Sequence, residues 1–174
     1  MKTYWFVLTL PLFIGLPASA QTVNNNVENI TPDNRYTIHS DGTVTDNVTG
    51  LMWQQCSLGQ TWETNGGEGS CSGTATIHTW DNALIQAADN RDYGYSDWRL
   101  PNIKELTSLV AEDRYSPAIN STVFPSPPSS CFLWSGSPFL NNYNNSWAMN
   151  CSYGYLSNGS RKNSLNVRLV RSAP

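Results

Sequence analysis

The sequence predicts an α+β domain in which two helices are segregated from antiparallel strands. Three observations predict it: alternating β-type residues before position 54, two segments of helical periodicity between 80 and 111, and short β-like pieces separated by turns after 130. The 174 residues suit one domain. Charged residues are 13% of the chain, against about 25% in typical domains, which argues against a disordered polyelectrolyte, a coiled coil or a basic nucleic-acid-binding domain.

Residues 1–20 are typical of a secretory signal peptide. Lys2 precedes an apolar run, and Ala18-Ser19-Ala20 ends it. The run is shorter than the roughly 20 residues that span a bilayer, and no later stretch is apolar enough to do so. We expect cleavage after Ala20 and a secreted or periplasmic chain without a membrane span. Residues 21–34 are expected to form a short mobile arm, and 35–174 the domain.

Four cysteines in an exported chain favour disulfides, and three connectivities are open. Nearest-neighbour pairing joins Cys56 to Cys71 and Cys131 to Cys151, and each bond would close a loop of turn-forming residues. The first loop, 57–70, holds four glycines and would be floppy without a cross-link. The alternative is a metal site with four thiolates, but the tight C-x2–4-C pairs of zinc sites are missing.

A three-strand meander is expected over 36–53. Asp41-Gly42 between β-branched runs is a hairpin signal, and Asp46, Asn47 and Gly50 mark a second turn. Oxygen atoms of Asp41, Asp46 and Asn47 also suit calcium, but turn chemistry explains them without a metal, and no EF-hand pattern occurs. We therefore predict no metal or other cofactor.

Two helices are expected, near 80–89 and 103–111. Thr79 is a plausible N-cap of the first, with Asp81 in its first turn. Asn102 and Glu105 fit a capping pair at the start of the second, whose apolar residues fall on one stripe.

Proline is dense after residue 116, which excludes further long helices. The remaining β-like pieces are 131–136, 146–154 and 165–172, with turns at 141–145 and 157–163.

Four segments together resemble a known family: 41–53, 94–109, 133–138 and 166–171. Their order and spacing are similar to the Lcl C-terminal domain family, named for the C-terminal domain of the Legionella collagen-like adhesin. The resemblance covers about residues 33–171. It implies a C-type lectin-like fold, in which the terminal strands pair with each other and a long-loop region holds the binding surface. The adhesin binds sulfated glycosaminoglycans and self-associates, but its collagen-like repeats are missing here.

The most specific of these segments, Trp98-Arg99-Leu100-Pro101, is expected to be structural. Trp98 and Leu100 would fill the core, Arg99 would pair with Asp97 or a backbone carbonyl, and Pro101 would start a helix.

Catalytic groups are poorly represented. The two histidines, His39 and His78, lie on a predicted strand and just before a helix, and no G-x-S-x-G motif occurs. The lectin-like group also resembles formylglycine-generating enzymes, but these need free active-site cysteines, whereas all four cysteines here are assigned to disulfides. We predict that the protein is not an enzyme and has no catalytic residue.

The predicted binding surface lies between 137 and 163, where aromatic residues lie among many Asn and Ser. Aromatic faces stack on sugars and Asn amides bond to hydroxyls, although about half of these aromatics would equally serve as core residues. Four basic residues in the last fourteen positions suit an anionic ligand or a charged edge strand: Arg161, Lys162, Arg168 and Arg171. Arg168 is expected to point outward from a strand. The predicted ligand-binding residues are Tyr143, Trp147, Tyr153, Tyr155, Arg161 and Lys162.

These observations predict a secreted, non-catalytic binding domain for a glycan or a surface protein, acting in adhesion or at the bacterial envelope. The alternatives are a structural subunit of an extracellular or envelope assembly, or an enzyme on a formylglycine-generating-enzyme-like scaffold. No nucleic acid partner is expected, and an oligomer remains open.

Overall fold

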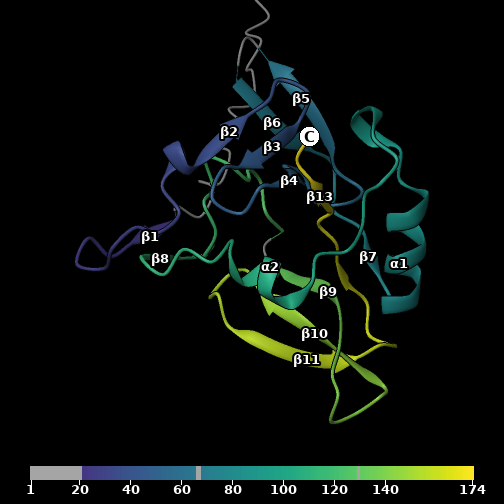
Figure 1. Ribbon diagram of the computed structural model, residues 1–174. Coiled ribbons are helices and arrows are strands. Elements are labelled where there is room, and N and C mark those ends of the chain that lie inside the picture. Colours follow the sequence, from purple (N-terminus) through teal and green to yellow (C-terminus); the bar gives the residue numbers. More distant parts are fainter. Residues whose placement is uncertain (1–20, 66–67, 129) are drawn as a thin grey trace, which may run out of the picture.

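The computed structural model describes residues 21–65, 68–128 and 130–174, and the expected signal peptide lies outside these residues. The fold is α+β and consists mostly of sheet, as predicted. Figure 1 shows one sheet above and a second below, with the longer helix on one flank. No helix among the described residues has the length and apolar character needed to cross a bilayer.

The upper sheet contains the predicted meander. Its strands run in the order β13-β4-β3-β2, and all neighbours are antiparallel. The turn chemistry is as expected, because Asp41 Oδ1 accepts from the Thr43 amide at 2.9 Å and Asp46 Oδ1 from the Val48 amide at 3.0 Å. The last strand pairs with β4, not with a strand at the N-terminus as the resemblance implied. The strands are β2 (Tyr36–Ile38), β3 (Thr43–Asp46), β4 (Leu51–Gln54) and β13 (Val170–Ser172).

The lower sheet has the order β11-β10-β9-β12-β7, in which only β12 and β9 run parallel. Residues 157–163 were expected to be a turn, but Leu156–Ser160 form β11. This prediction was wrong because β11 pairs along its length with β10, which satisfies the backbone of a segment of low β propensity. The strands are β7 (Ile77–His78), β9 (Phe132–Pro138), β10 (Asn145–Asn150), β11 (Leu156–Ser160) and β12 (Leu165–Asn166).

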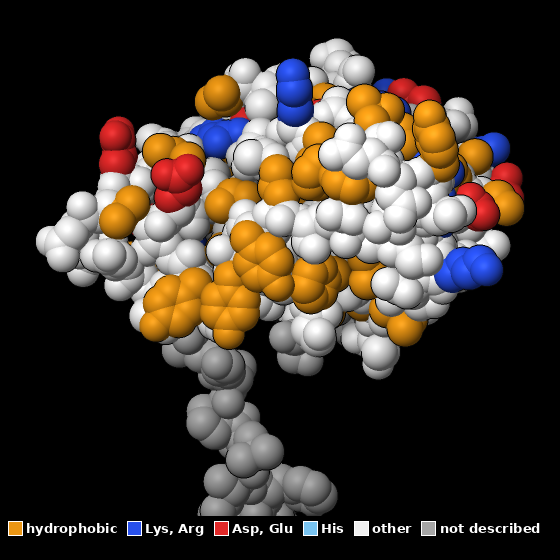
Figure 2. Space-filling model, turned by 90° about the horizontal axis from the view of Figure 1, so that it is seen from below, with side chains coloured by type: hydrophobic (Ala, Val, Ile, Leu, Met, Phe, Trp, Pro, Cys, Tyr) orange, Lys and Arg blue, Asp and Glu red, His pale blue; other side chains and the backbone are white. Residues whose placement is uncertain are grey.

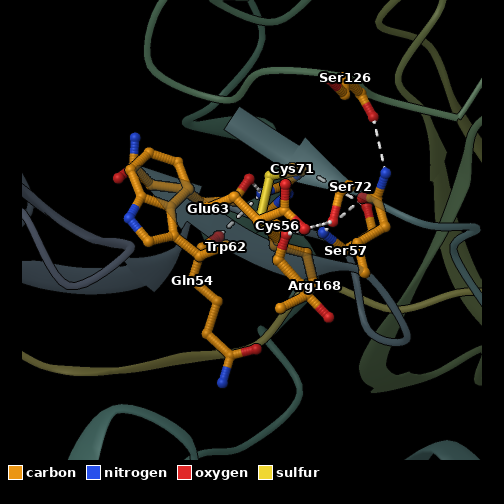
Figure 3. The surroundings of a disulfide bond; sticks show 12 residues. Gln54, Cys56, Ser57, Trp62, Glu63, Cys71, Ser72, Ser126 and Arg168 are labelled. Atoms are coloured by element: carbon orange, nitrogen blue, oxygen red, sulfur yellow. Dashed lines mark hydrogen bonds between the residues drawn. A yellow bond between two sulfur atoms is a disulfide. The ribbon is translucent and has the colours of Figure 1, made fainter. Parts of the chain in front are cut away.

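The segment after Cys56 is a hairpin and not the irregular loop expected. Its strands β5 (Thr61–Asn65) and β6 (Glu68–Ser72) pair in register, and the Cys56–Cys71 disulfide anchors β6 to the end of β4. Figure 3 shows this cross-link beside Trp62 and Glu63 of β5. Cys131 and Cys151 form the second disulfide, so both predicted pairings are confirmed.

The start of the described chain is docked onto the domain. β1 (Thr22–Val23) pairs with β8 (Arg114–Tyr115), and Gln21 Nε2 donates to the carbonyls of Pro117 and Ile119 at 2.6 and 2.7 Å. Residues 21–23, part of the segment expected to form a mobile arm, therefore contact the domain. Next along the chain is the 3-10 turn η1 (Asp33–Arg35).

Both predicted helices form, as α1 (Trp80–Asp89) and α2 (Ile103–Thr107). The Asn102–Glu105 capping box is confirmed, whereas Thr79 occupies the N-cap of α1 without a side-chain hydrogen bond. α2 is shorter than predicted because Val110 forms a β-bridge with Ile119, which takes the chain out of helical geometry. A second 3-10 turn, η2 (Asp92–Gly94), follows α1.

Trp98 and Leu100 are buried, as predicted for a structural motif. Arg99 donates to the backbone carbonyl of Leu100 at 3.2 Å, one of the two predicted partners, and also pairs with Glu105 at 2.7 Å, because the capping box holds that carboxylate next to it. The other predicted partner, Asp97, pairs with Arg171. Burial opposes ionisation of Glu105, but hydrogen bonds from Arg99 and the Asn102 amide outweigh it and lower the pKa of the carboxyl.

Arg168 is buried, which corrects the prediction that it points outward. Its side chain is 1% exposed, donates to the carbonyls of Gln54 and Gln55, and lies 4.8 Å from the Phe124 ring centroid. Residues 167–169 connect β12 to β13 and are not a strand, so inward and outward positions do not alternate there. Desolvation lowers the pKa of Arg168 to about 10.

Candidate functional site

Three segments meet at the end of the lower sheet where β10 begins and β11 ends. They are the start of α1, the loop 139–144 before β10, and the loop 161–164 after β11. The Trp80 amide donates to the carbonyl of Arg161 at 3.0 Å, and the Arg161 amide donates to the carbonyl of Asn144 at 2.8 Å. These backbone bonds place the start of the helix and both loops around one point.

Two contacts hold the Arg161 side chain in a fixed orientation at this point. Its guanidinium carbon lies 4.1 Å from the Trp80 ring centroid, and its Nε donates to Ser146 Oγ at 2.9 Å. Within the described part of the chain, its two terminal nitrogens make no hydrogen bond. The stacking and the single bond therefore hold the planar group while leaving two nitrogens able to donate to a ligand.

A shallow pocket of about 390 Å³ opens beside Arg161. Tyr143 is 85% exposed and Lys162 is exposed, so both present polar ends to solvent at its mouth. This volume lies at the lower end of the range of small-molecule sites, about 300–1,000 Å³. The pocket combines hydroxyls, an amide, two cations and one carboxylate: Thr79, Asp81, Tyr143, Asn144, Ser160, Arg161 and Lys162.

The other predicted tyrosines lie at the opposite end of the hairpin. Tyr153 and Tyr155 are in or next to the β10–β11 turn and are 65% and 50% exposed. Asn145 pairs with Ser160 at one end, and Met149 pairs with Leu156 near the other. At about 3.4 Å per residue, these strands separate the pocket from the turn by roughly 15 Å.

Trp147 lies between the two ends and is half-buried. Its ring packs edge-on against Phe139, with the centroids 5.0 Å apart. Tyr155 packs edge-on against Phe132 in the same way, at 6.1 Å. The six predicted residues thus do not form one site: Tyr143, Arg161 and Lys162 share the pocket, and the other three do not line it.

The face that carries β10 and β11 is rich in hydrophobic side chains. Figure 2 views the molecule from that side and shows them gathered in a band. The exposed large hydrophobic residues between positions 139 and 160 are Leu140, Tyr143, Tyr153, Tyr155 and Leu156.

The sequence did not identify Thr79, Asp81, Asn144 or Ser160 as pocket residues. Thr79 and Asp81 were interpreted only as helix-start residues, although their proximity to Arg161 depends on a tertiary contact. The basic residues near the C-terminus also separate, because Arg171 pairs with Asp97 outside the pocket.

Each histidine lies within hydrogen-bonding distance of a threonine hydroxyl. His39 Nε2 lies 2.9 Å from Thr45 Oγ1, and His78 Nε2 lies 2.8 Å from Thr76 Oγ1. All four cysteines are in disulfides. In residues 21–174, apart from the undescribed positions, no three acidic, cysteine or histidine side chains cluster as metal ligands.

Comparison with known proteins gives one match to a family model. The model described as the Lcl C-terminal domain matches residues 42–171. No curated protein matches the chain significantly. The matched range begins after β1 and β2 and includes every later strand up to the start of β13, both helices and all the residues that line the pocket.

Proposed function

This chain belongs to the Lcl C-terminal domain family, and from that premise we propose that it is a non-catalytic binding domain for a glycan at the bacterial cell surface or envelope. The family's adhesin character and the two disulfides fit an extracellular or periplasmic location. The α+β arrangement and the family membership together support a C-type lectin-like fold. Cleavage after Ala20 belongs to the same proposal, and a mature mass starting at Gln21 would support it.

The pocket beside Arg161 is the observation that carries this proposal. A guanidinium that is stacked on Trp80 and bonded to Ser146 is oriented before a ligand arrives, so binding requires little further ordering. Its free nitrogens match carboxylate or sulfate oxygens, and Lys162 adds a second cation. The exposed ring of Tyr143 offers a face for sugar C–H groups. These features favour an acidic saccharide over a neutral one at this pocket.

An array of acidic and uncharged glycans, probed with the purified mature chain, tests this assignment. We expect binding to sulfated or carboxylated saccharides, with weaker binding at higher salt because the cations are exposed to solvent. Arg161→Ala should lower the affinity about tenfold or more, since oriented arginines are frequent binding hot spots. Lys104→Ala removes an exposed cation on α2, outside the pocket, and serves as the control.

Two outcomes contradict the proposal. The first is silence of all acidic glycans on the array, and the second is unchanged binding by Arg161→Ala when that variant keeps its thermal unfolding curve. Incubation with a bound glycan should also leave the glycan chemically intact. A cleaved or oxidised product would instead favour the enzyme alternative.

Contact with another protein is a second candidate function, favoured by β11. This strand lies at the edge of its sheet, and Leu156 on it is 42% exposed beside Tyr155. An unpaired strand edge with adjacent apolar side chains suits a protein partner or an envelope assembly. Pull-down from envelope fractions with wild type and Leu156→Lys would separate this function from glycan binding.

A further inference from the structure

A second and larger cavity lies on a different part of the molecule. It measures about 1070 Å³ and is bounded by the β2–β3 turn, the β5–β6 hairpin and the loop 121–125. It shares no lining residue with the pocket beside Arg161. Its described lining residues are Ile38, His39, Ser40, Gln55, Trp62, Thr64, Gly69, Ser121, Thr122 and Pro125.

Trp62 is the aromatic residue in the wall of this cavity. Its Nε1 donates to the Ser40 carbonyl at 3.1 Å, which connects the β5–β6 hairpin to the β2–β3 turn. The ring lies directly on Gly69, where an added Cβ would come within 1.8 Å of the indole. A Cβ added at Gly42 would likewise come within 2.6 Å of the indole. The side chain is therefore held in place, and because it is only half-buried, part of its surface remains open to the cavity.

The wall around Trp62 is polar but uncharged. Four hydroxyl residues line it, with the imidazole of His39: Ser40, Thr64, Ser121 and Thr122. None of the described lining residues is Lys, Arg, Asp or Glu. A charged ligand would lose hydration here without gaining an ionic partner, so the wall favours a ligand that is polar and neutral.

Gln55 forms part of the same wall and is almost completely buried. It is 1% exposed, and its Nε2 donates to the Val123 carbonyl at 2.8 Å. Its Oε1 accepts no hydrogen bond within the described part of the chain. Buried side-chain oxygens are normally satisfied, so this carbonyl retains unused acceptor capacity directly behind the cavity wall.

We propose that this cavity binds a neutral saccharide, with one face of a sugar ring against Trp62. A sugar combines an apolar C–H face, which suits an indole, with hydroxyls that both donate and accept, which suit the surrounding side chains. The volume slightly exceeds the usual range for small-ligand sites, about 300–1,000 Å³, and accommodates more than one sugar unit. The site is independent of the acidic-glycan pocket, because its elements and its charge differ.

Saturation-transfer NMR of the mature chain with neutral methyl glycosides and their disaccharides provides the test. A single sugar should bind with a Kd on the order of 1 mM, the range expected for a ligand of about a dozen heavy atoms. Trp62→Ala should weaken binding at least tenfold, while Trp62→Phe, which keeps a flat ring, should stay within about threefold of wild type. Arg161→Ala should leave the affinity unchanged, so that failure at one site is distinguishable from failure at the other.

A second pair of variants keeps the test valid if Trp62→Ala does not fold. Thr122 is exposed on the rim, so Thr122→Arg narrows the opening without entering the core, and Thr122→Ser is its matched control. We expect loss of saccharide binding in the first and retention in the second. The proposal is overturned if no neutral glycoside binds at several tens of millimolar. It is also overturned if Thr122→Arg binds as well as Thr122→Ser, or if the cavity takes only peptides.

Discussion

Replacing Arg168 by Met tests whether its buried guanidinium stabilises the fold. The side chain donates to the carbonyls of Gln54 and Gln55 at the end of β4 and lies over Phe124, and no carboxylate pairs with it among the described residues. Met has a similar length but no donors. The substitution therefore leaves two carbonyls without this partner and at the same time removes a buried charge.

The magnitudes decide the expected direction. Two hydrogen bonds from a charged donor contribute about 1.5–3 kcal/mol each, and the contact with Phe124 adds about 1–2 kcal/mol. Against this, the fall of the pKa of Arg168 from 12.5 to about 10 corresponds to roughly 3 kcal/mol of desolvation cost, which Met does not carry. The losses exceed the gain, so we expect Arg168→Met to lower the free energy of unfolding by about 3 kcal/mol.

Urea unfolding of the oxidised protein, followed by tryptophan fluorescence, measures this change. The corresponding decrease in Tm is about 10 °C for a chain of this size. Arg168→Lys should also be less stable than wild type, because an ammonium cannot reproduce the forked guanidinium geometry. Lys104→Met is the surface control and should change stability by less than about 0.5 kcal/mol. Equal or greater stability of Arg168→Met would refute the reasoning and show that the desolvation cost dominates.

Three further predictions concern stability. Asp46→Asn breaks the 2.6 Å ion pair with Arg35 and should cost about 3 kcal/mol at pH 7. Burial opposes ionisation of Asp46, but the hydrogen bonds from Arg35 and its other donors lower its pKa, so this stabilisation is present above about pH 4 and is lost as the pH falls further. Urea titrations at several pH values should show the two proteins converging in acid, and a constant difference would contradict this. The double substitution Cys56→Ser/Cys71→Ser opens a 15-residue loop and should cost about 3 kcal/mol by thermal unfolding, whereas an unchanged Tm would show that the hairpin needs no cross-link. Asn102→Ala should lose about 1 kcal/mol by chemical unfolding and Asn102→Asp much less, because only the first removes the N-cap acceptor of α2.

Local signals predicted those parts of the fold that depend on neighbouring residues. Asp41-Gly42 and Asp46 predicted the two turns of the meander, because their side chains bond to amides two residues along. The capping pair Asn102 and Glu105 likewise acts across three residues. Both partners of each interaction lie within three residues of one another, so a short sequence motif is enough to predict it.

Errors arose where a distant partner decides the conformation. β11 is made of Leu, Ser, Asn and Gly, and it is a strand because β10 lies beside it. The hairpin of β5 and β6 contains glycines that resemble a loop, yet Gly69 is where Trp62 packs. Arg168 was expected on a strand with alternating faces, but it lies in a connection that is buried on all sides.

The candidate site was also predicted only in part from the sequence. The sequence predicted that aromatic, Asn and basic residues of 137–163 form a binding surface, and Tyr143, Arg161 and Lys162 do line one pocket. It could not predict that Tyr153 and Tyr155 lie at the far end of the hairpin, since that follows from the register of β10 with β11. Nor could it associate Trp80 with Arg161, which are about eighty positions apart and meet through a backbone bond.

By itself, the sequence indicated the α+β class and the family and favoured the two disulfide pairings that the structure contains, because composition, cysteine spacing and short motifs are local properties. Only the tertiary structure decided which side chains share a pocket, which cation is buried and where Trp62 faces a cavity. The physical reason is that burial and pocket formation depend on long-range packing of strands and loops. The energy of that packing is a sum over pairs that are remote in the chain, and no single segment encodes it.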